Sequence, residues 1–224
     1  MKVRDWMTEN VIVLNEHDNV IKAMQIFKEH KIRRIPVVKN GKLVGIVTDR
    51  DIKSSTPPEV FSTDIYETYY LISNLKIRDI MAPNPVTVKP EDEIEKAAIL
   101  MLEHKISGLP VVDESEKVVG IITQTDIFKA FVSMSGAFLE SYKVMLSVNS
   151  YKDLVKIMEI FERFSIKPKF VYNVICWKEE DCLEDQCKRE VVLKLATSEA
   201  LINQIVKELE KEFEVRYVSL SKPD

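Results

Sequence analysis

VRDWMTENVIVLNEHDNVIKAMQIFKEHKIRRIPVVKNGKLVGIVTDRDI, residues 3–52, recurs in the same chain as IRDIMAPNPVTVKPEDEIEKAAILMLEHKISGLPVVDESEKVVGIITQTDI, residues 77–127. The offset is 74 residues through most of the copy and becomes 75 at Gly45 and Gly120. The single slip falls in a turn, where insertions are tolerated. An internal repeat of this length decides the fold before any local propensity does.

Each copy predicts the same order of elements, β-α-β-β-α. A short strand, at 11–14 and at 86–88, precedes an amphipathic helix whose N-caps we expect to be Asp18 and Asp92. Two β-branched runs around a polar turn then form a hairpin, and a second helix follows. The apolar positions that give the first helix one buried face are Val20, Ala23, Met24 and Phe27, and in the second copy Ile94, Ala97, Ala98 and Met101.

The two copies predict one packed module. A single copy would leave one face of its sheet uncovered, whereas two copies can close one core. We therefore expect a module over 1–135, with repeat 1 at about 1–55 and repeat 2 at about 76–135. An insertion at 54–76 separates them, and its residues 65–72 suggest a short aromatic helix.

The pattern changes after Gly136. Strand-like and helix-like segments follow in the order β-α-β-β-α-β, which is the ferredoxin-like order, so a second domain is expected over 141–224. The fold class is therefore α/β (α+β), with two β-α-β-β-α repeats and a βαββαβ domain.

Composition limits the functions that remain. The 224 residues carry a formal net charge of −4, and no apolar run approaches the ~20 residues of a spanning helix. We expect a cytoplasmic protein that binds neither nucleic acid nor membrane. Cys176, Cys182 and Cys187 fit neither a disulfide framework nor a zinc pattern, so no metal is expected. No catalytic motif is present, so we expect no enzyme activity and no catalytic cofactor.

Each hairpin ends in a Thr-x-x-Asp phrase, Thr48 to Asp51 and Thr123 to Asp126. A helix N-terminus and a threonine hydroxyl suit a phosphate, and a carboxylate one turn away can accept two hydroxyls of a ribose. The same phrase is a capping box, in which the two side chains satisfy the backbone of the first turn. From these residues alone, a nucleotide site and a plain cap both remain open.

The whole of residues 1–135 resembles a tandem pair of CBS domains, the Bateman module. The matching phrases are VRDWM and IRDIM, EHKIRRIPVV and EHKISGLPVV, and GIVTDRD and GIITQTD. The complete order also resembles the acetoin-utilisation accessory protein family, in which an ACT-like domain follows two CBS repeats. The resemblance implies a homodimer and adenosyl ligands: AMP, ADP, ATP or S-adenosylmethionine.

The resemblance also implies that each pocket is shared between the copies. One pocket would hold Thr123, Asp126, Val11, Ile12, Ile32 and Pro36, with its phosphate end near Arg33 and Arg34. The other would hold Thr48, Asp51, Val86, Thr87, Ile106, Ser107 and Pro110. We expect the arginine pair to give the first pocket the stronger preference for phosphate, because guanidinium groups bind phosphate bidentately.

The leading hypothesis is a regulator that responds to a nucleotide through a change in partner binding or in dimer geometry. The alternative is an amino-acid-sensing or purely oligomerising protein without a nucleotide site. In the second domain, the junction SVNSYKD lacks the glycine that ligand-binding ACT domains carry, so Asn149 or Ser150 is more simply an N-cap. His30 and His104, which close the first helix of each copy, suit the helix dipole better than a metal.

Overall fold

A computed structural model describes residues 1–55, 74–137, 140–168, 170–174 and 189–222. The chain divides into two compact units, Met1–Phe128 and Lys129–Asp224. The helix expected over 65–72 and the three cysteines lie outside the described residues, and the domain limits 1–135 and 141–224 remain predictions. Across the described ranges, none of the helices is long and apolar enough to cross a membrane.

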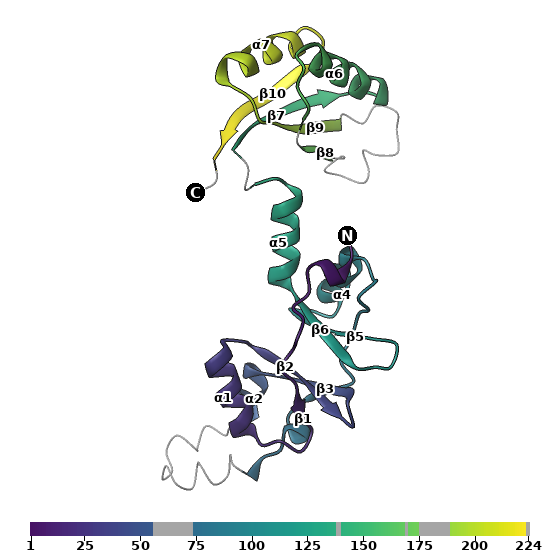
Figure 1. The fold of residues 1–224 in the computed structure, drawn as a ribbon, viewed down its shortest axis with the longest axis vertical. Helices are drawn as coiled ribbons and strands as arrows, with labels where there is room; N and C mark the ends of the chain where they lie inside the picture. The colour runs from purple at the N-terminus through teal and green to yellow at the C-terminus, as the bar shows by residue number, and fades with distance from the viewer. Residues whose placement is uncertain (56–73, 138–139, 169, 175–188, 223–224) are drawn as a thin grey trace. The chain divides into compact units, whose positions relative to one another are not determined.

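The first unit contains both repeats apart from the end of α5, and the helices and hairpins of the two copies correspond (Figure 1). Repeat 1 consists of β1 (Leu14–Asn15), α1 (Val20–His30), β2 (Arg34–Lys39), β3 (Lys42–Thr48) and α2 (Asp49–Ser55). Repeat 2 consists of β4 (Ala82–Pro83), α4 (Ile94–Glu103), β5 (Gly108–Val112), β6 (Val118–Thr123) and α5 (Gln124–Met134). The β2–β3 and β5–β6 hairpins are antiparallel, and β1 runs parallel to β2.

The first strand of each copy is shorter than the sequence predicts. β1 covers only Leu14–Asn15, and in repeat 2 a single bridge joins Val88 to Val111. The N-cap predictions were also wrong, because α1 is capped by Asn19, whose side chain accepts a hydrogen bond from the Lys22 N–H at 3.0 Å. Asp18 instead closes the preceding turn by accepting from the Asn15 N–H at 2.8 Å.

The capping pattern of repeat 2 and the outward face of α1 also differ from expectation. At α4 the N-cap is Glu93, which makes no side-chain cap, while Asp92 accepts from the Lys89 N–H at 2.8 Å. Met24 is 46% exposed, so it does not belong to the buried face of α1.

The leading segments of the two repeats, residues 2–8 and 76–82, pack on the opposite copy. The Val3 N–H donates to the Asp92 carbonyl at 2.9 Å, and the Ile77 N–H donates to the Asp18 carbonyl at 2.9 Å. Both apolar side chains are completely buried. Ile77 joins the core of repeat 1, so a residue of repeat 2 completes that core.

A glycine in each hairpin leaves room for the leading segment of the opposite copy, so we call these two segments exchanged. A Cβ at Gly45 would lie 2.3 Å from the Met81 sulfur, and one at Gly120 would lie 2.5 Å from the Met7 sulfur. β4 pairs with β3 beside Gly45, and Thr8 forms a bridge with Ile121 beside Gly120. The two repeats are therefore bound to each other by backbone pairing as well as by side chains.

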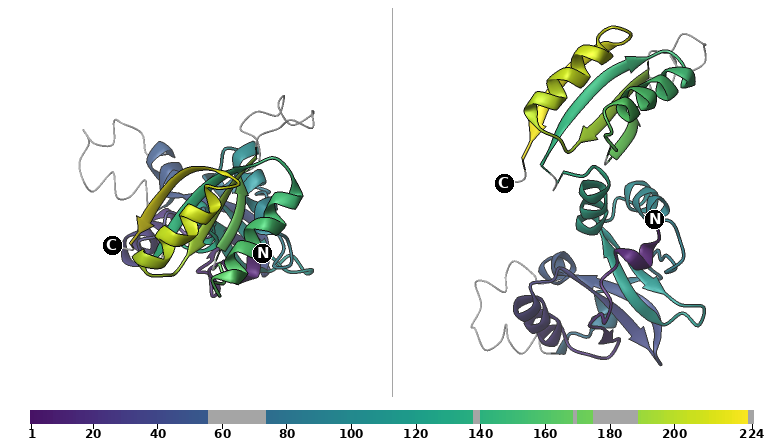
Figure 2. Two further views of the ribbon diagram at one scale, coloured as in Figure 1. Left: turned by 90° about the horizontal axis from the view of Figure 1, so that it is seen from above. Right: turned by 45° about the horizontal axis from the view of Figure 1, so that its top comes forward.

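The second unit has the predicted order β-α-β-β-α-β. Its elements are β7 (Ser141–Val148), α6 (Tyr151–Arg163), β8 (Phe170–Val174), β9 (Arg189–Leu195), α7 (Glu199–Leu209) and β10 (Glu214–Ser221). The sheet order is β10-β7-β9-β8, with every neighbouring pair antiparallel. Both helices lie on one face of this sheet (Figure 2).

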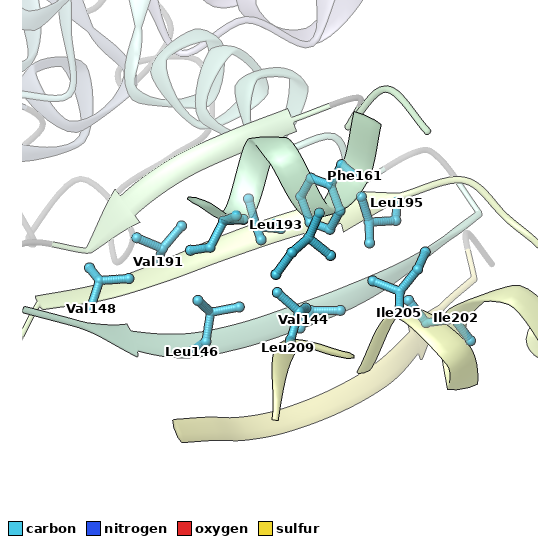
Figure 3. Close-up of a cluster of buried hydrophobic side chains, with 12 residues drawn as sticks. Val144, Leu146, Val148, Phe161, Val191, Leu193, Leu195, Ile202, Ile205 and Leu209 are labelled. Carbon is cyan, nitrogen blue, oxygen red and sulfur yellow. The ribbon is translucent and has the colours of Figure 1, made fainter. Parts of the chain in front are cut away.

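The core of the second unit lies between that sheet face and the two helices. Alternate residues of β7 and β9 point toward the helices, as period-two alternation requires (Figure 3). Phe161 of α6 and Ile205 of α7 meet them from the helices. The labelled sheet residues are Val144, Leu146, Val148, Val191, Leu193 and Leu195.

Lys194 is a buried cation among the described residues of this unit. It is 4% exposed, and its ammonium donates to the Gly136 carbonyl at 3.0 Å. Burial lowers the pKa of Lys194, and the nearby charge of Lys143 lowers it further. The hydrogen bond holds the chain that follows α5 against this sheet.

Candidate functional site

A cavity of about 1060 Å³ lies between the two repeats. Its volume is at the upper end of the ~300–1,000 Å³ typical of small-ligand sites. The walls from repeat 1 are Arg33, Arg34, Ile46, Thr48, Asp49, Arg50, Asp51 and Lys53. The walls from repeat 2 are Ala82, Asn84, Pro85, Val86, His104, Lys105, Ile106, Ser107, Gly108, Pro110 and Gln124.

The lining of this cavity is positively charged, although the whole chain carries a formal charge of −4. Two carboxylates, Asp49 and Asp51, face five cations. The cations are Arg33, Arg34, Arg50, Lys53 and Lys105. Lys53 pairs with Asp49 at 3.4 Å, so the remaining excess lies on the arginines and Lys105. Such a lining attracts anions, and arginine forks suit phosphate oxygens.

Thr48 and Asp51 form a complete capping box at the start of α2. The Asp51 Oδ2 accepts from both the Thr48 N–H and the Thr48 hydroxyl at 2.7 Å, and the Asp51 N–H donates to the Thr48 Oγ1 at 3.3 Å. The capping interpretation is therefore confirmed at this position. Both bonds to the carboxylate use Oδ2, so capping does not engage Oδ1 and does not exclude a role in ligand binding.

Thr123 and Asp126 repeat this arrangement at the start of α5. The Asp126 Oδ2 accepts from the Thr123 N–H at 3.0 Å and from the Thr123 hydroxyl at 2.7 Å. Asp126 is 7% exposed, which makes it one of the most buried carboxylates among the described residues. The two copies therefore present the same threonine–carboxylate geometry.

Arg34 crosses the cleft from repeat 1 to repeat 2. Its Nη1 donates to the Ser107 carbonyl at 2.5 Å, and its Nη2 donates to the Ser107 hydroxyl. Burial lowers the pKa of Arg34 and the charge of Arg33 lowers it further, while Asp49 and Asp126 act to raise it. The guanidinium thus lies within the field of carboxylates from both copies.

The cavity brings together most residues of one predicted pocket. Those residues are Thr48, Asp51, Val86, Ile106, Ser107 and Pro110; Thr87 is not part of the lining. The lining also contains none of the residues that the sequence assigns to the other pocket apart from the arginine pair. The residues outside it are Thr123, Asp126, Val11, Ile12, Ile32 and Pro36.

The arginine pair also lines the cavity of the predicted pocket to which the sequence did not assign it. Arg33 and Arg34 line the cavity that contains Thr48 and Asp51, which the sequence expected to have only hydroxyl and backbone donors. The assignment of the pair to the pocket of Thr123 and Asp126 stays a prediction, and the charge of Asp126 does act to raise the pKa of Arg34. The Arg34 side chain is long enough to leave β2 and reach Ser107.

Sequence reasoning also missed several polar and apolar walls. Arg50 and Lys53 follow the Thr48 cap within one or two helical turns, so their presence near the cavity could have been read from the helix. Ala82, Asn84 and Pro85 belong to the chain that leads into Val86 and were hidden by the segment exchange. His104, which the sequence assigned to the helix end, is both the C-cap of α4 and a wall of the cavity.

Comparison with known proteins identifies the repeats. The model of the CBS domain matches residues 3–56 and 77–133. Inosine-5'-monophosphate dehydrogenase from Korarchaeum cryptofilum is 34% identical over 129 residues, which are 57% of this chain and 24% of that protein. The chain spans between 23% and 46% of the length of the first four curated relatives.

Two solved structures extend the comparison. The structure of CBSX2 in complex with AMP is 29% identical with a TM-score of 0.50, covering 60% of this chain and 98% of that chain. A structure described as the acetoin utilization protein AcuB from Vibrio cholerae is also 29% identical with a TM-score of 0.50. It covers 61% of this chain and 93% of that chain.

Proposed function

Because the first unit of this chain is a tandem pair of CBS domains, we propose that the chain is a regulatory protein that binds an adenine nucleotide between its repeats. The observation that carries the proposal is the cationic cavity, in which five lysines and arginines surround a Thr48–Asp51 pair. A positive site in an acidic chain selects an anionic ligand. The similar CBSX2 structure contains AMP.

The walls of the cavity match the parts of a nucleotide. The second oxygen of Asp51 is available to accept ribose hydroxyls while its Oδ2 caps α2. Arg33 and Arg34 supply donors for phosphate. The adenine ring would lie against the apolar walls, Ile46, Val86, Ile106 and Pro110.

Charge also ranks the adenosyl ligands that the resemblance implies. AMP, ADP and ATP carry phosphate, whereas S-adenosylmethionine carries a positive sulfonium group. Five cations against two carboxylates favour the phosphates and oppose the sulfonium. We therefore expect ATP, ADP or AMP to bind more tightly than S-adenosylmethionine.

A thermal-shift panel followed by calorimetric titration tests the proposal, since a ligand that binds the native state raises its apparent stability. AMP, ADP and ATP should raise the melting temperature of the full chain, and S-adenosylmethionine should do so less. Asp51→Asn should weaken AMP binding by ~1–3 kcal/mol, the range for a hydrogen bond to a charged group. Asp126→Asn should do the same if the second copy of the cap also serves a ligand.

The matched control is Asp153→Asn. Asp153 is also a capping carboxylate, accepting from the Ser150 N–H at 2.9 Å, but it belongs to the second unit and lines no part of the cavity. It should leave AMP binding unchanged. If none of the nucleotides binds, or if Asp51→Asn and Asp126→Asn both bind AMP like the parent, the cap-only interpretation is correct.

We also propose that the second unit is an ACT-like, ferredoxin-like domain whose role is assembly. Its element order and its antiparallel order β10-β7-β9-β8 support the domain type. At the β7–α6 junction, Asp153 already accepts from the Asn149 N–H at 2.8 Å and from the Ser150 N–H at 2.9 Å. Those donors are used by the chain itself, which argues against capture of an amino-acid carboxylate there.

We further propose that the chain is non-catalytic and forms a homodimer through repeat 2. Large apolar side chains are exposed on α4 and α5: Ile99 at 53%, Leu102 at 74%, Phe128 at 67% and Phe131 at 66%. Exposed apolar patches of this kind mark protein contacts, and the resemblance implies pairing through these helices. The ligand-dependent output would then be a change in dimer geometry or in the binding of a regulated protein.

Sedimentation equilibrium at micromolar concentration tests the dimer. Leu102→Glu and Phe128→Glu should give monomers, because a charge in an apolar interface is left without a partner. Val155→Glu is the control, since Val155 is 58% exposed on α6 of the second unit. A parent that sediments as a monomer, or a dimer broken only by Val155→Glu, would contradict assembly through repeat 2.

A further inference from the structure

The two repeats differ strongly in side-chain size at Arg34, which lines the cleft. The 74-residue offset aligns Arg34 with Gly108. The Arg34 guanidinium lies directly on that glycine, because a Cβ at Gly108 would be 2.1 Å from Nη1 and 2.9 Å from Cζ. At this contact between the copies, the Arg34 guanidinium of repeat 1 fills the space that a side chain at Gly108 of repeat 2 would need.

The contacts of Arg34 hold it between the copies. The Ser107 carbonyl accepts both the Arg34 Nη1 at 2.5 Å and the Gln124 N–H, the first amide of α5, at 3.2 Å. The equivalent carbonyl in repeat 1, that of Arg33, accepts the first amide of α2, from Asp49, at 3.2 Å. The backbone of Arg34 lies in β2 beside the start of α2, and its guanidinium places a positive charge beside the start of α5.

The carboxylates around Arg34 come from both helices. Asp49 is the first residue of α2, and Asp126 lies in the first turn of α5. Both act on the charge of Arg34. The guanidinium therefore lies within the field of Asp126 on the α5 side, and on the α2 side it lines the same cavity as Thr48 and Asp51. A second arginine would not fit, because a Cβ at 108 already collides with the first.

We propose that Arg34 is a single phosphate-binding cation shared by two nucleotide sites, one at Thr48–Asp51 and one at Thr123–Asp126, so that the sites compete for it. A nucleotide in one site draws the guanidinium toward its phosphate and leaves the other site without it. The second nucleotide then binds more weakly than the first. The inference rests on the proposed nucleotide binding and adds the coupling between the sites.

Calorimetric titration of the full chain with AMP tests the competition. The parent should bind two AMP per chain, with the second step at least ~10-fold weaker, which corresponds to one charged hydrogen-bond contact. Arg34→Met keeps the aliphatic stem and removes the charge, so the two steps should converge to within about threefold while the first weakens. Adenosine has no phosphate and should show no such inequality in the parent.

Two further variants make the result decisive. Arg34→Gln repeats the loss of charge with a polar side chain, in case the methionine variant folds poorly. Arg4→Met removes a surface cation that pairs with Glu91, and it should leave both steps unchanged.

The outcomes separate this inference from the proposed function. Two equal AMP steps in the parent, a single AMP per chain in both the parent and Arg34→Met, or an inequality that survives both Arg34 variants would overturn the sharing of Arg34 alone. A parent that binds no AMP would overturn the nucleotide site itself.

Discussion

The two repeats have matching hairpins and matching caps, yet they contribute differently to the cleft. Repeat 1 places Arg33 and Arg34 where repeat 2 places Ser107 and Gly108. Gly108 has a role of its own, because it supplies the space that Arg34 of the other copy occupies. A difference between duplicated sequences therefore has to be interpreted at the contact between the copies and not within one copy.

The two leading segments, residues 2–8 and 76–82, form the frame around the cleft, and to this frame the two copies contribute equally. Each leading segment packs on the other repeat through the same pair of backbone bonds: Val3 to Asp92 and Arg4 to Pro90, and Ile77 to Asp18 and Arg78 to Glu16. Ile77 of repeat 2 completes the core of repeat 1, and Val3 of repeat 1 is likewise completely buried. The comparison thus predicts symmetric effects in the frame and asymmetric effects in the cleft.

The largest expected effect tests the symmetric part. Ile77→Ala should lower the free energy of unfolding of the first unit by about 2–5 kcal/mol, because Ile77 is completely buried in the core of repeat 1. Val3→Ala should cost about two thirds as much, since two carbon atoms are removed in place of three. Urea unfolding followed by circular dichroism measures both. A negligible cost at one position and a large cost at the other would show that only one segment is exchanged.

The next effect concerns the glycines beneath the exchanged segments. Gly45→Val and Gly120→Val should each destabilise the first unit by about 1–3 kcal/mol, the usual cost of overpacking. The reason is common to both, because a Cβ there meets the sulfur of Met81 or of Met7. The same unfolding experiment measures them, and costs that differ by more than a factor of two would break the symmetry of the frame.

Gly108→Ala is the matched comparison for these two variants. The three atoms nearest to its Cβ all belong to the outer part of the Arg34 side chain, which can swing away. The loss of stability should therefore be smaller than at Gly45 or Gly120, while the inequality of the two AMP steps should change. A stability loss as large as that of the other glycines would mean that Arg34 is locked in place.

Much of this fold could be predicted from the sequence because it depends on local patterns. The hairpins follow from β-branched runs around a turn, and the caps follow from the Thr-x-x-Asp spacing, so both appear in the structure at the expected residues. The second unit follows from alternation in β7 and from the amphipathic pattern of α6. Each of these features needs only residues close together in the chain.

The segment exchange and the site of Arg34 could not be predicted in this way. VRDWM and IRDIM are so similar that packing on the same copy or on the opposite copy buries the same kind of side chain. Nothing local distinguishes the two arrangements. The reach of Arg34 depends on the empty space at Gly108, which lies in another repeat. Met24 is exposed for a similar reason, since helical spacing gives the direction of a face but not its width.

The smallest expected effect lies at the hairpin tips, where the extra residue of the second turn brings the copies together. The Lys42 ammonium donates to the Glu116 carboxylate at 2.8 Å, and the Leu43 N–H donates to the Glu116 carbonyl at 3.1 Å. The Lys42 hydrogen bond lowers the pKa of Glu116, so any stability from the pair is present above the ordinary carboxyl pKa and is lost as the pH falls through the lowered value. Both side chains are largely exposed, at 61% and 68%, so solvent and salt screen the attraction.

Glu116→Gln keeps the backbone bond, so it should lower the melting temperature only slightly at neutral pH and low salt. In 1 M salt the attraction is screened to a range of ~3 Å, and below the carboxyl pKa the charge is removed, so the variant should then melt like the parent. Differential scanning calorimetry at low and high salt measures the difference. A large loss that persists in high salt would show that the carboxylate, and not the backbone bond, joins the two tips.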